Sequence, residues 1–119
     1  SVFEGTNFSN SAMIMTGIYD SKLNNSNFEN TNLTKAEILD SSLQSANFKN
    51  SRLIWADLSN NYLQNSIFIN AELRNVNFTN TDLTNANLSN AILTGADFTN
   101  AVLAGANLNC IGHPICEND

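Results

Sequence analysis

The residues of this chain that could do chemistry are few, and several of them lie at one end. Cys110 and Cys116 have the spacing C-x5-C near the C-terminus, and His113, the only histidine, lies between them. A zinc site would need closer cysteine pairs or more ligands. The pair therefore predicts a disulfide, with free thiols and metal or redox chemistry as the alternatives.

No pattern in the sequence arranges a catalytic site. Acid–base or nucleophilic catalysis needs a poised acid, base or nucleophile in a pocket. His113 has no serine or cysteine partner in any catalytic motif, and the 11 acidic residues are scattered over positions that we expect to face solvent. The sequence predicts a protein that is not an enzyme and has no cofactor or metal site.

The composition argues against two direct ligands. The 119 residues carry a formal net charge of −6 with only five basic residues. A protein that binds nucleic acid needs a basic stripe against the phosphates. No apolar run approaches the ~18 residues of a membrane span. We expect no direct binding of nucleic acid and no membrane insertion.

The elements that must position these residues follow a five-residue period. Leu, Phe, Ile or Met occupies every fifth position, here called the centre, from Phe3 to Leu108 in 22 consecutive pentads. The position two before the centre is Ala, Ser or Thr in 20 pentads, with Asn61 and Val76 as exceptions. The position two after it is Asn, Gly or Asp in 17 pentads, and these types favour turns. Each pentad predicts one large and one small inward side chain, then a corner.

The phenylalanines indicate how many pentads close one coil. Four Phe pairs are separated by 20 residues and none by 15. Because aromatic rings stack well on each other, four pentads should close a four-sided coil. Repeats of this kind bury their apolar faces only by stacking, so we expect Phe28 to contact Phe8 and Phe48. The amide of Asn61 would be buried, and we expect it to bond to backbone at a corner or to mark a distortion.

The pentads "ANFKN", "ADLSN" and "ADFTN" resemble the A(D/N)LXX motif of the pentapeptide-repeat family. The resemblance extends over essentially all of residues 1–110. It implies an all-β fold, a right-handed quadrilateral parallel β-helix, here a solenoid of about five and a half coils. We expect a repeat domain over residues 1–109 and a C-terminal cap or tail over residues 110–119.

The two ends of the repeat carry separate expectations. The tail "NCIGHPICEND" breaks the pattern, with His113 at the next centre position, and should cap the rod. Ser1 is already in register, so the first coil either lost a cap or is covered by another copy or domain. A structural disulfide indicates an oxidising compartment. Since the resemblance implies cyanobacterial relatives in the periplasm and thylakoid lumen, we expect an extracytoplasmic protein, with a cytoplasmic location as the alternative.

The resemblance implies a structural or protein-interaction module, because most family members have no assigned biochemical activity. The partner is an unknown protein, and a homodimer is included. The alternative is a DNA-mimicking inhibitor or protector of DNA gyrase, as some members are. Against it, the acidic residues here are mixed with basic ones, and no loop interrupts the pentads.

A candidate partner surface comes from apolar residues at outward positions. They fall on adjoining sides of the predicted rod, and they are Ile14, Met15, Tyr19, Leu39, Ile54 and Trp55. Trp55 is the only tryptophan, and it occupies a corner position that elsewhere usually holds Asn or Gly. Isolated surface hydrophobes are normal, but a contiguous apolar strip marks a contact surface, and Trp and Tyr are common anchors of such surfaces.

Overall fold

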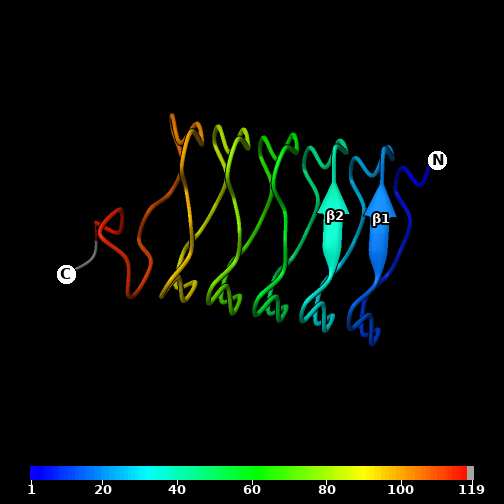
Figure 1. Ribbon diagram of the computed structural model, residues 1–119, viewed down its shortest axis with the longest axis horizontal. Coiled ribbons are helices and arrows are strands. Elements are labelled where there is room, and N and C mark those ends of the chain that lie inside the picture. Colours follow the sequence, from blue (N-terminus) through cyan, green and yellow to red (C-terminus); the bar gives the residue numbers. More distant parts are fainter. Residues whose placement is uncertain (118–119) are drawn as a thin grey trace.

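The computed structural model describes residues 1–117 as a row of coils stacked along one axis (Figure 1). Two strands, β1 (Gly17–Tyr19) and β2 (Glu37–Leu39), pair in parallel with Ile18 opposite Ile38. Elsewhere single parallel bridges join residues twenty apart, as Val2 and Lys22 do. The described residues contain no helix, and the rod measures 38 × 24 × 19 Å. Four pentads therefore make one coil, as the spacing of the phenylalanines predicts.

Each coil has four sides, one for each pentad. The first side carries the centre Phe3 and every twentieth residue after it. The second, third and fourth sides begin in the same way with Phe8, Met13 and Ile18. Two further residues of each pentad, one before and one after the centre, point outward. These side numbers are used below for every outward residue.

Backbone hydrogen bonds along the rod axis hold the coils in register. The centre Phe28 donates its N–H to the carbonyl of Asn47 in the next coil at 2.7 Å. Asn27, one residue earlier, donates to the carbonyl of Thr6 in the preceding coil at 2.9 Å. Each coil is thus bonded to both of its neighbours, so its register follows from theirs.

The corners share one unusual backbone conformation. Eighteen corner residues other than glycine have φ between 49° and 63°, and Gly5, Gly95 and Gly105 also have positive φ. This left-handed conformation costs most side chains ~1–2 kcal/mol and is tolerated best by Gly, Asn and Asp. The prevalence of asparagine at the corners therefore has a conformational reason.

Stacked aromatic rings fill one side of the core. Phe8, Phe28, Phe48 and Phe68 on the second side lie with successive ring centroids 4.8 Å apart. The rings of Phe28 and Phe48 are fully buried. The expected contacts of Phe28 with Phe8 and Phe48 are confirmed.

The position before the centre has a structural role that the sequence analysis did not assign. Asn27 accepts a hydrogen bond from the N–H of Glu29 at 2.9 Å, and Asp57 accepts one from the N–H of Ser59 at 3.0 Å. Comparable bonds are made by Asn7, Asn32, Asn47, Asn77, Asp82, Asn87, Asp97 and Asn107. They satisfy an N–H that the bonds between coils leave unused, which explains the preference for Asn or Asp in this position.

Asn61 is a buried hydrogen-bonding hub. Its Nδ2 donates to the carbonyls of Ile38 and Leu58, and its Oδ1 accepts from the N–H of Ser41 at 2.8 Å. The expectation that this amide bonds to backbone at a corner is therefore confirmed. Ser66 has the same inward position in the next pentad, but its buried hydroxyl has no partner.

The first prediction concerns the aromatic stack. Replacing Phe48 with Ala should reduce the free energy of unfolding by ~3–5 kcal/mol, because it leaves a cavity between two buried rings. Chemical denaturation of the wild type and the variant measures the loss. Phe3→Ala is the control, since Phe3 is 39% exposed in the first coil and should cost much less. Equal losses for the two variants would contradict the buried stack.

The second prediction compares two inward polar residues. Asn61→Ala should lose about 2–4 kcal/mol, because buried backbone groups lose their partners. Ser66→Ala should be neutral or stabilising, because it removes a hydroxyl without a partner. Thermal and denaturant unfolding of both variants decides the matter. A neutral Asn61→Ala would mean that the corner backbone re-forms its own bonds.

Candidate functional site

The residues of the predicted apolar surface do not form one continuous strip along the rod. Met15 and Trp55 lie in the corner column between the third and fourth sides, but they are two coils apart, with Lys35 between them. Ile14 and Ile54 are separated in the same way by a threonine. The expected strip is therefore interrupted, and its two apolar levels lie about 10 Å apart along the axis.

Trp55 combines high exposure with an unfavourable backbone conformation. Its side chain is 61% exposed, and its φ is 63°. Met15 is also exposed and has a φ of 61°. A bulky residue in the left-handed region pays a conformational cost, which neither side chain recovers by burial in the rod. Such strain is typical of functional positions.

Tyr19 reaches back across the fourth side. A Cβ on Gly17 would lie 2.6 Å from the Tyr19 hydroxyl oxygen, so the ring occupies the space that a larger residue would fill. The hydroxyl donates to Glu37 Oε1 at 2.6 Å. This hydrogen bond raises the pKa of Tyr19 above its ordinary value, because ionisation would remove the donor and place two negative charges together. Leu39 follows Tyr19 in the same column, opposite it in the register of β1 and β2.

The acidic residues are distributed unevenly around the rod. Five carboxylates belong to the fourth side and its closing corner, and they are Asp20, Glu37, Asp40, Asp57 and Asp97. No basic residue lies on that side, although Lys35 lies at the corner before it. The other three sides carry four acidic residues, Glu4, Glu29, Glu72 and Asp82, and five basic ones, Lys22, Lys35, Lys49, Arg52 and Arg74. The negative net charge of the repeat region therefore comes from the fourth side.

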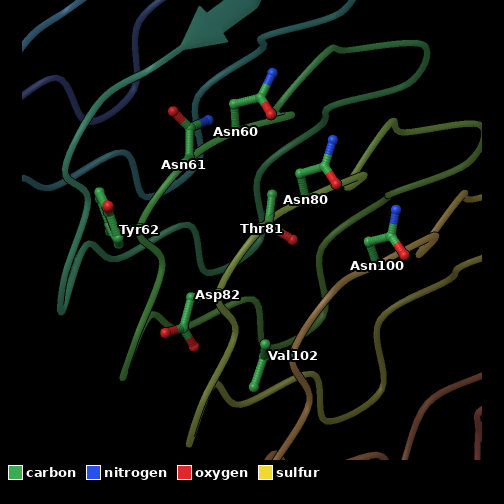
Figure 2. Close-up of a pocket in the computed structure, with 8 residues that line it drawn as sticks. All are labelled: Asn60, Asn61, Tyr62, Asn80, Thr81, Asp82, Asn100 and Val102. Atoms are coloured by element: carbon green, nitrogen blue, oxygen red, sulfur yellow. The ribbon is translucent and has the colours of Figure 1, made fainter.

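An open hollow along the corner between the fourth and first sides was not predicted from the sequence. It is lined by Asn60, Asn61, Tyr62, Asn80, Thr81, Asp82, Asn100 and Val102. Figure 2 shows the amides of Asn60, Asn80 and Asn100 in the same orientation, one in each successive coil. Asp82 accepts a hydrogen bond from Gln64 Nε2 at 3.0 Å. With one carboxylate and no neighbouring base, this lining does not assemble a catalytic pair.

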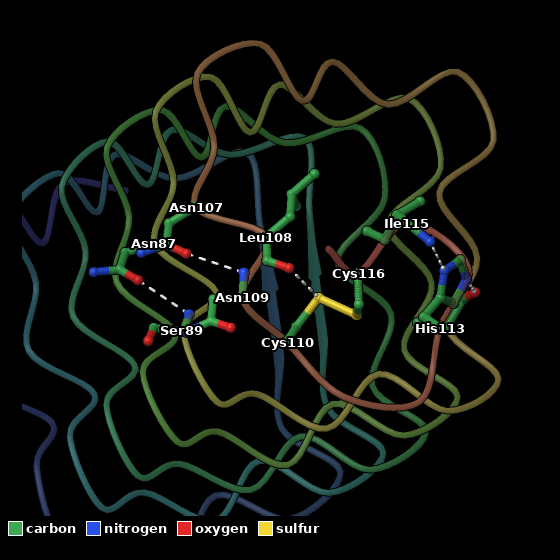
Figure 3. Close-up of a disulfide and its surroundings, with 10 residues drawn as sticks. Asn87, Ser89, Asn107, Leu108, Asn109, Cys110, His113, Ile115 and Cys116 are labelled. Atoms are coloured by element: carbon green, nitrogen blue, oxygen red, sulfur yellow. Dashed lines mark hydrogen bonds between the residues drawn. A yellow bond between two sulfur atoms is a disulfide. The ribbon is translucent and has the colours of Figure 1, made fainter. Parts of the chain in front are cut away.

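The C-terminal tail closes over the last coil by a disulfide. Cys110 and Cys116 are joined, with their Cα atoms 5.1 Å apart (Figure 3). Both cysteines are buried. The N–H of Glu117 returns to the carbonyl of Leu108 at 2.8 Å, which ties the end of the loop to the rod.

His113 does not occupy the inward centre position that the repeat register predicts. Ile111 bridges Ile92, a spacing one residue shorter than a coil, so the register shifts before the histidine. The His113 ring instead packs edge-on against Phe98 with centroids 5.1 Å apart, and its Nε2 lies 2.9 Å from the carbonyl of Ala96. The N–H of Ile115 donates to Nδ1, which indicates that Nε2 carries the proton and donates to Ala96. His113 therefore caps a carbonyl that an additional coil would otherwise bond.

Charge pairing between coils is sparse. Among residues 1–117, Arg52 and Glu72, which are twenty residues apart, form the single ion pair, at 3.7 Å, whereas Glu29 and Lys49 have the same spacing and do not pair. No group of three or more His, Cys, Asp or Glu residues within this range could hold a metal ion. In the same range no helix is long and apolar enough to cross a membrane.

The chain matches the family model for pentapeptide repeats over residues 19–50, 51–90 and 81–110. Among solved structures, it is similar to a pentapeptide repeat protein from the Arabidopsis thaliana thylakoid lumen, with 29% identity and a TM-score of 0.36 over 89% of this chain and 63% of that chain. HetL of the cyanobacterium Nostoc, a pentapeptide repeat protein involved in regulating heterocyst differentiation, has 20% identity and a TM-score of 0.40 over 91% and 60%.

A trypsin-treated form of QnrB1, a plasmid-mediated fluoroquinolone resistance protein, has 19% identity and a TM-score of 0.50 over 88% of this chain and 68% of that chain. Similarity at this level concerns the fold alone. The chain spans less than two thirds of the length of the first two of these structures. A comparison with curated protein sequences finds no match.

A third prediction concerns the disulfide. Intact protein should yield two alkylatable thiols only after reduction, as mass spectrometry can measure. Cys110→Ser should lower stability by about 2 kcal/mol, because the short loop no longer restrains the unfolded chain. Reduced wild type provides the matched comparison. Two free thiols in protein taken from its native compartment would contradict the bond.

Proposed function

Because this chain belongs to the pentapeptide-repeat family, we propose that it is a non-enzymatic module that binds a protein partner through its outer surface. The proposal includes the family's right-handed quadrilateral winding. It also includes a repeat domain over residues 1–109 and a cap over residues 110–119, of which residues 118–119 lie outside the described part of the chain. The docking surface lies at the corner between the third and fourth sides. It consists of Ile14, Met15 and Tyr19 in the first coil, Leu39 in the second, and Ile54 and Trp55 in the third.

The observation that carries this proposal is the conformation of Trp55. A corner position favours Asn or Gly, yet here the chain places its only tryptophan in left-handed backbone with most of the side chain in solvent. Within the rod, this arrangement adds strain and buries little apolar area. Contact with a partner would bury the indole ring, and tryptophan is enriched among the residues that dominate interface energetics.

We also propose an oxidising compartment such as the periplasm or the thylakoid lumen. The support is the buried bond between Cys110 and Cys116 at the end of the rod. Disulfides of this structural kind persist outside the reducing cytosol. The measurement of thiols described above tests this location together with the bond.

A gyrase-directed DNA mimic is the second candidate, and the one-sided charge is the observation that favours it. The five carboxylates of the fourth side extend from the first coil to the fifth, over roughly 19 Å at the ~4.8 Å spacing of paired strands. Duplex DNA carries one charge per ~1.7 Å of axis, so the acidic side is much less dense. We expect added protein to leave DNA supercoiling by gyrase unchanged. Inhibition at stoichiometric concentrations would favour the mimic instead.

The fourth prediction tests the docking surface. Trp55→Asn should abolish capture of partner protein from an extract of the native compartment. It should also leave the fold intact and raise its stability by up to ~1 kcal/mol, because Asn tolerates the left-handed corner. Capture is measured with immobilised protein, and stability by thermal unfolding.

Tyr62→Asn is the matched control. Tyr62 is 59% exposed on the first side, and Asn is a usual residue at its position before the centre. This variant should capture the same protein as the wild type. Capture that survives in Trp55→Asn, or is lost equally in Tyr62→Asn, would contradict the proposed surface.

A further inference from the structure

The carboxylates of the fourth side repel one another and form no ion pair among residues 1–117. Glu37 and Asp57 are bridged partners in adjacent coils, and Asp20 and Asp40 follow one another in the closing corner column. Like charges directly opposite on paired strands destabilise a sheet. The ion pair of the described residues lies on the third side, so none of these acids has a cationic partner there. A cation from outside the chain would relieve the repulsion.

Local hydrogen bonds fix some of these carboxylates in place. Asp97 accepts from both the N–H and the hydroxyl of Thr99, at 2.9 and 2.6 Å. These donors lower the pKa of Asp97 below its ordinary value, because they stabilise the charged carboxylate. Since a carboxylate has about four acceptor sites, such bonds orient the group and still leave lone pairs for an external donor.

A second copy of this chain is a poor occupant for the fourth side. A closed twofold dimer places the same surface patch of each copy against the other. On this side, that arrangement would bring two sets of five carboxylates together. Anionic lipids and nucleic acids are disfavoured by the same charge.

The backbone of the fourth side is also unavailable to a partner. The centre Ile38 donates its N–H to the carbonyl of Asp57 in the next coil. Glu37 donates its N–H to the carbonyl of Thr16 in the preceding coil. A partner strand therefore finds no free edge on this face. Recognition must use side chains, namely carboxylates beside the exposed apolar groups of Met15, Tyr19 and Trp55.

These observations point to one kind of partner. We propose that the fourth side and the Trp55 corner bind a cationic amphipathic segment of another protein, whose lysine or arginine side chains flank apolar ones. This inference rests on the proposed function and specifies the chemistry of the partner. Apolar groups of the segment cover Trp55 and Met15, and its cations meet Glu37 and Asp57.

The experiment uses a synthetic amphipathic peptide of leucine and lysine and a matched peptide in which glutamate replaces lysine. Trp55, the only tryptophan, is a built-in reporter, because its fluorescence shifts to shorter wavelength when the exposed ring is covered. The lysine peptide should produce this shift, and its affinity should fall as salt is added. The glutamate peptide should produce none.

Two double variants with equal changes in charge locate the binding site. Glu37→Gln with Asp57→Asn should weaken binding of the lysine peptide by about tenfold, as expected for the loss of two exposed ion pairs. Glu4→Gln with Glu29→Gln, on the first and second sides, should leave the affinity within about twofold. Circular dichroism confirms that both variants fold.

The outcomes separate this inference from the proposed function. Equal weakening in the two double variants, equal binding of both peptides, or binding without a Trp55 shift would overturn the inference. If Trp55→Asn still abolished capture of the native partner, the docking surface would stand while its cationic partner would be rejected. If capture depended on neither Trp55 nor the fourth-side carboxylates, both proposals would fail.

Discussion

The left-handed corner is the constraint on which the rest of the structure depends. Each short side is only a few residues long, so the chain must turn sharply after every centre, and a positive φ at one residue produces that turn. The regular turns place residues twenty apart above one another, which allows the backbone bonds between coils to form. The stacking of Phe28 between Phe8 and Phe48 is a consequence of this geometry. Side-chain chemistry at the corners therefore determines the arrangement of the core.

The regular part of the fold could be predicted because each inward position has one physical requirement. The centres need a large apolar side chain, the positions directly after the corners need a small one, and the recurrence of phenylalanine gives the length of the coil. Asn61 illustrates the limit of this reasoning. The sequence shows that its buried amide needs hydrogen-bond partners. Only the structure identifies the backbone groups of Ile38, Leu58 and Ser41 as those partners.

The candidate surface was less predictable than the core. The pattern identifies outward positions, but it does not show that Lys35 separates Met15 from Trp55 until the corner columns are aligned. The position of His113 could not be predicted for a different reason. The pentads end at Leu108, so their period gives no information about the one-residue register shift at Ile111. The repeat pattern also does not specify the side-chain torsion angles that place the Tyr19 ring over Gly17.

The four-sided coil also restricts how the length of such a chain can change. Inserting or deleting twenty residues adds or removes one complete coil, and every later residue stays on the same side of the rod. A change of five residues preserves each corner and centre but turns everything after it by one side. Carboxylates such as Asp57 and Asp97 would then lie on a different side of the rod from Asp20. The columns of surface residues therefore stay aligned only when the chain changes length by a whole number of coils.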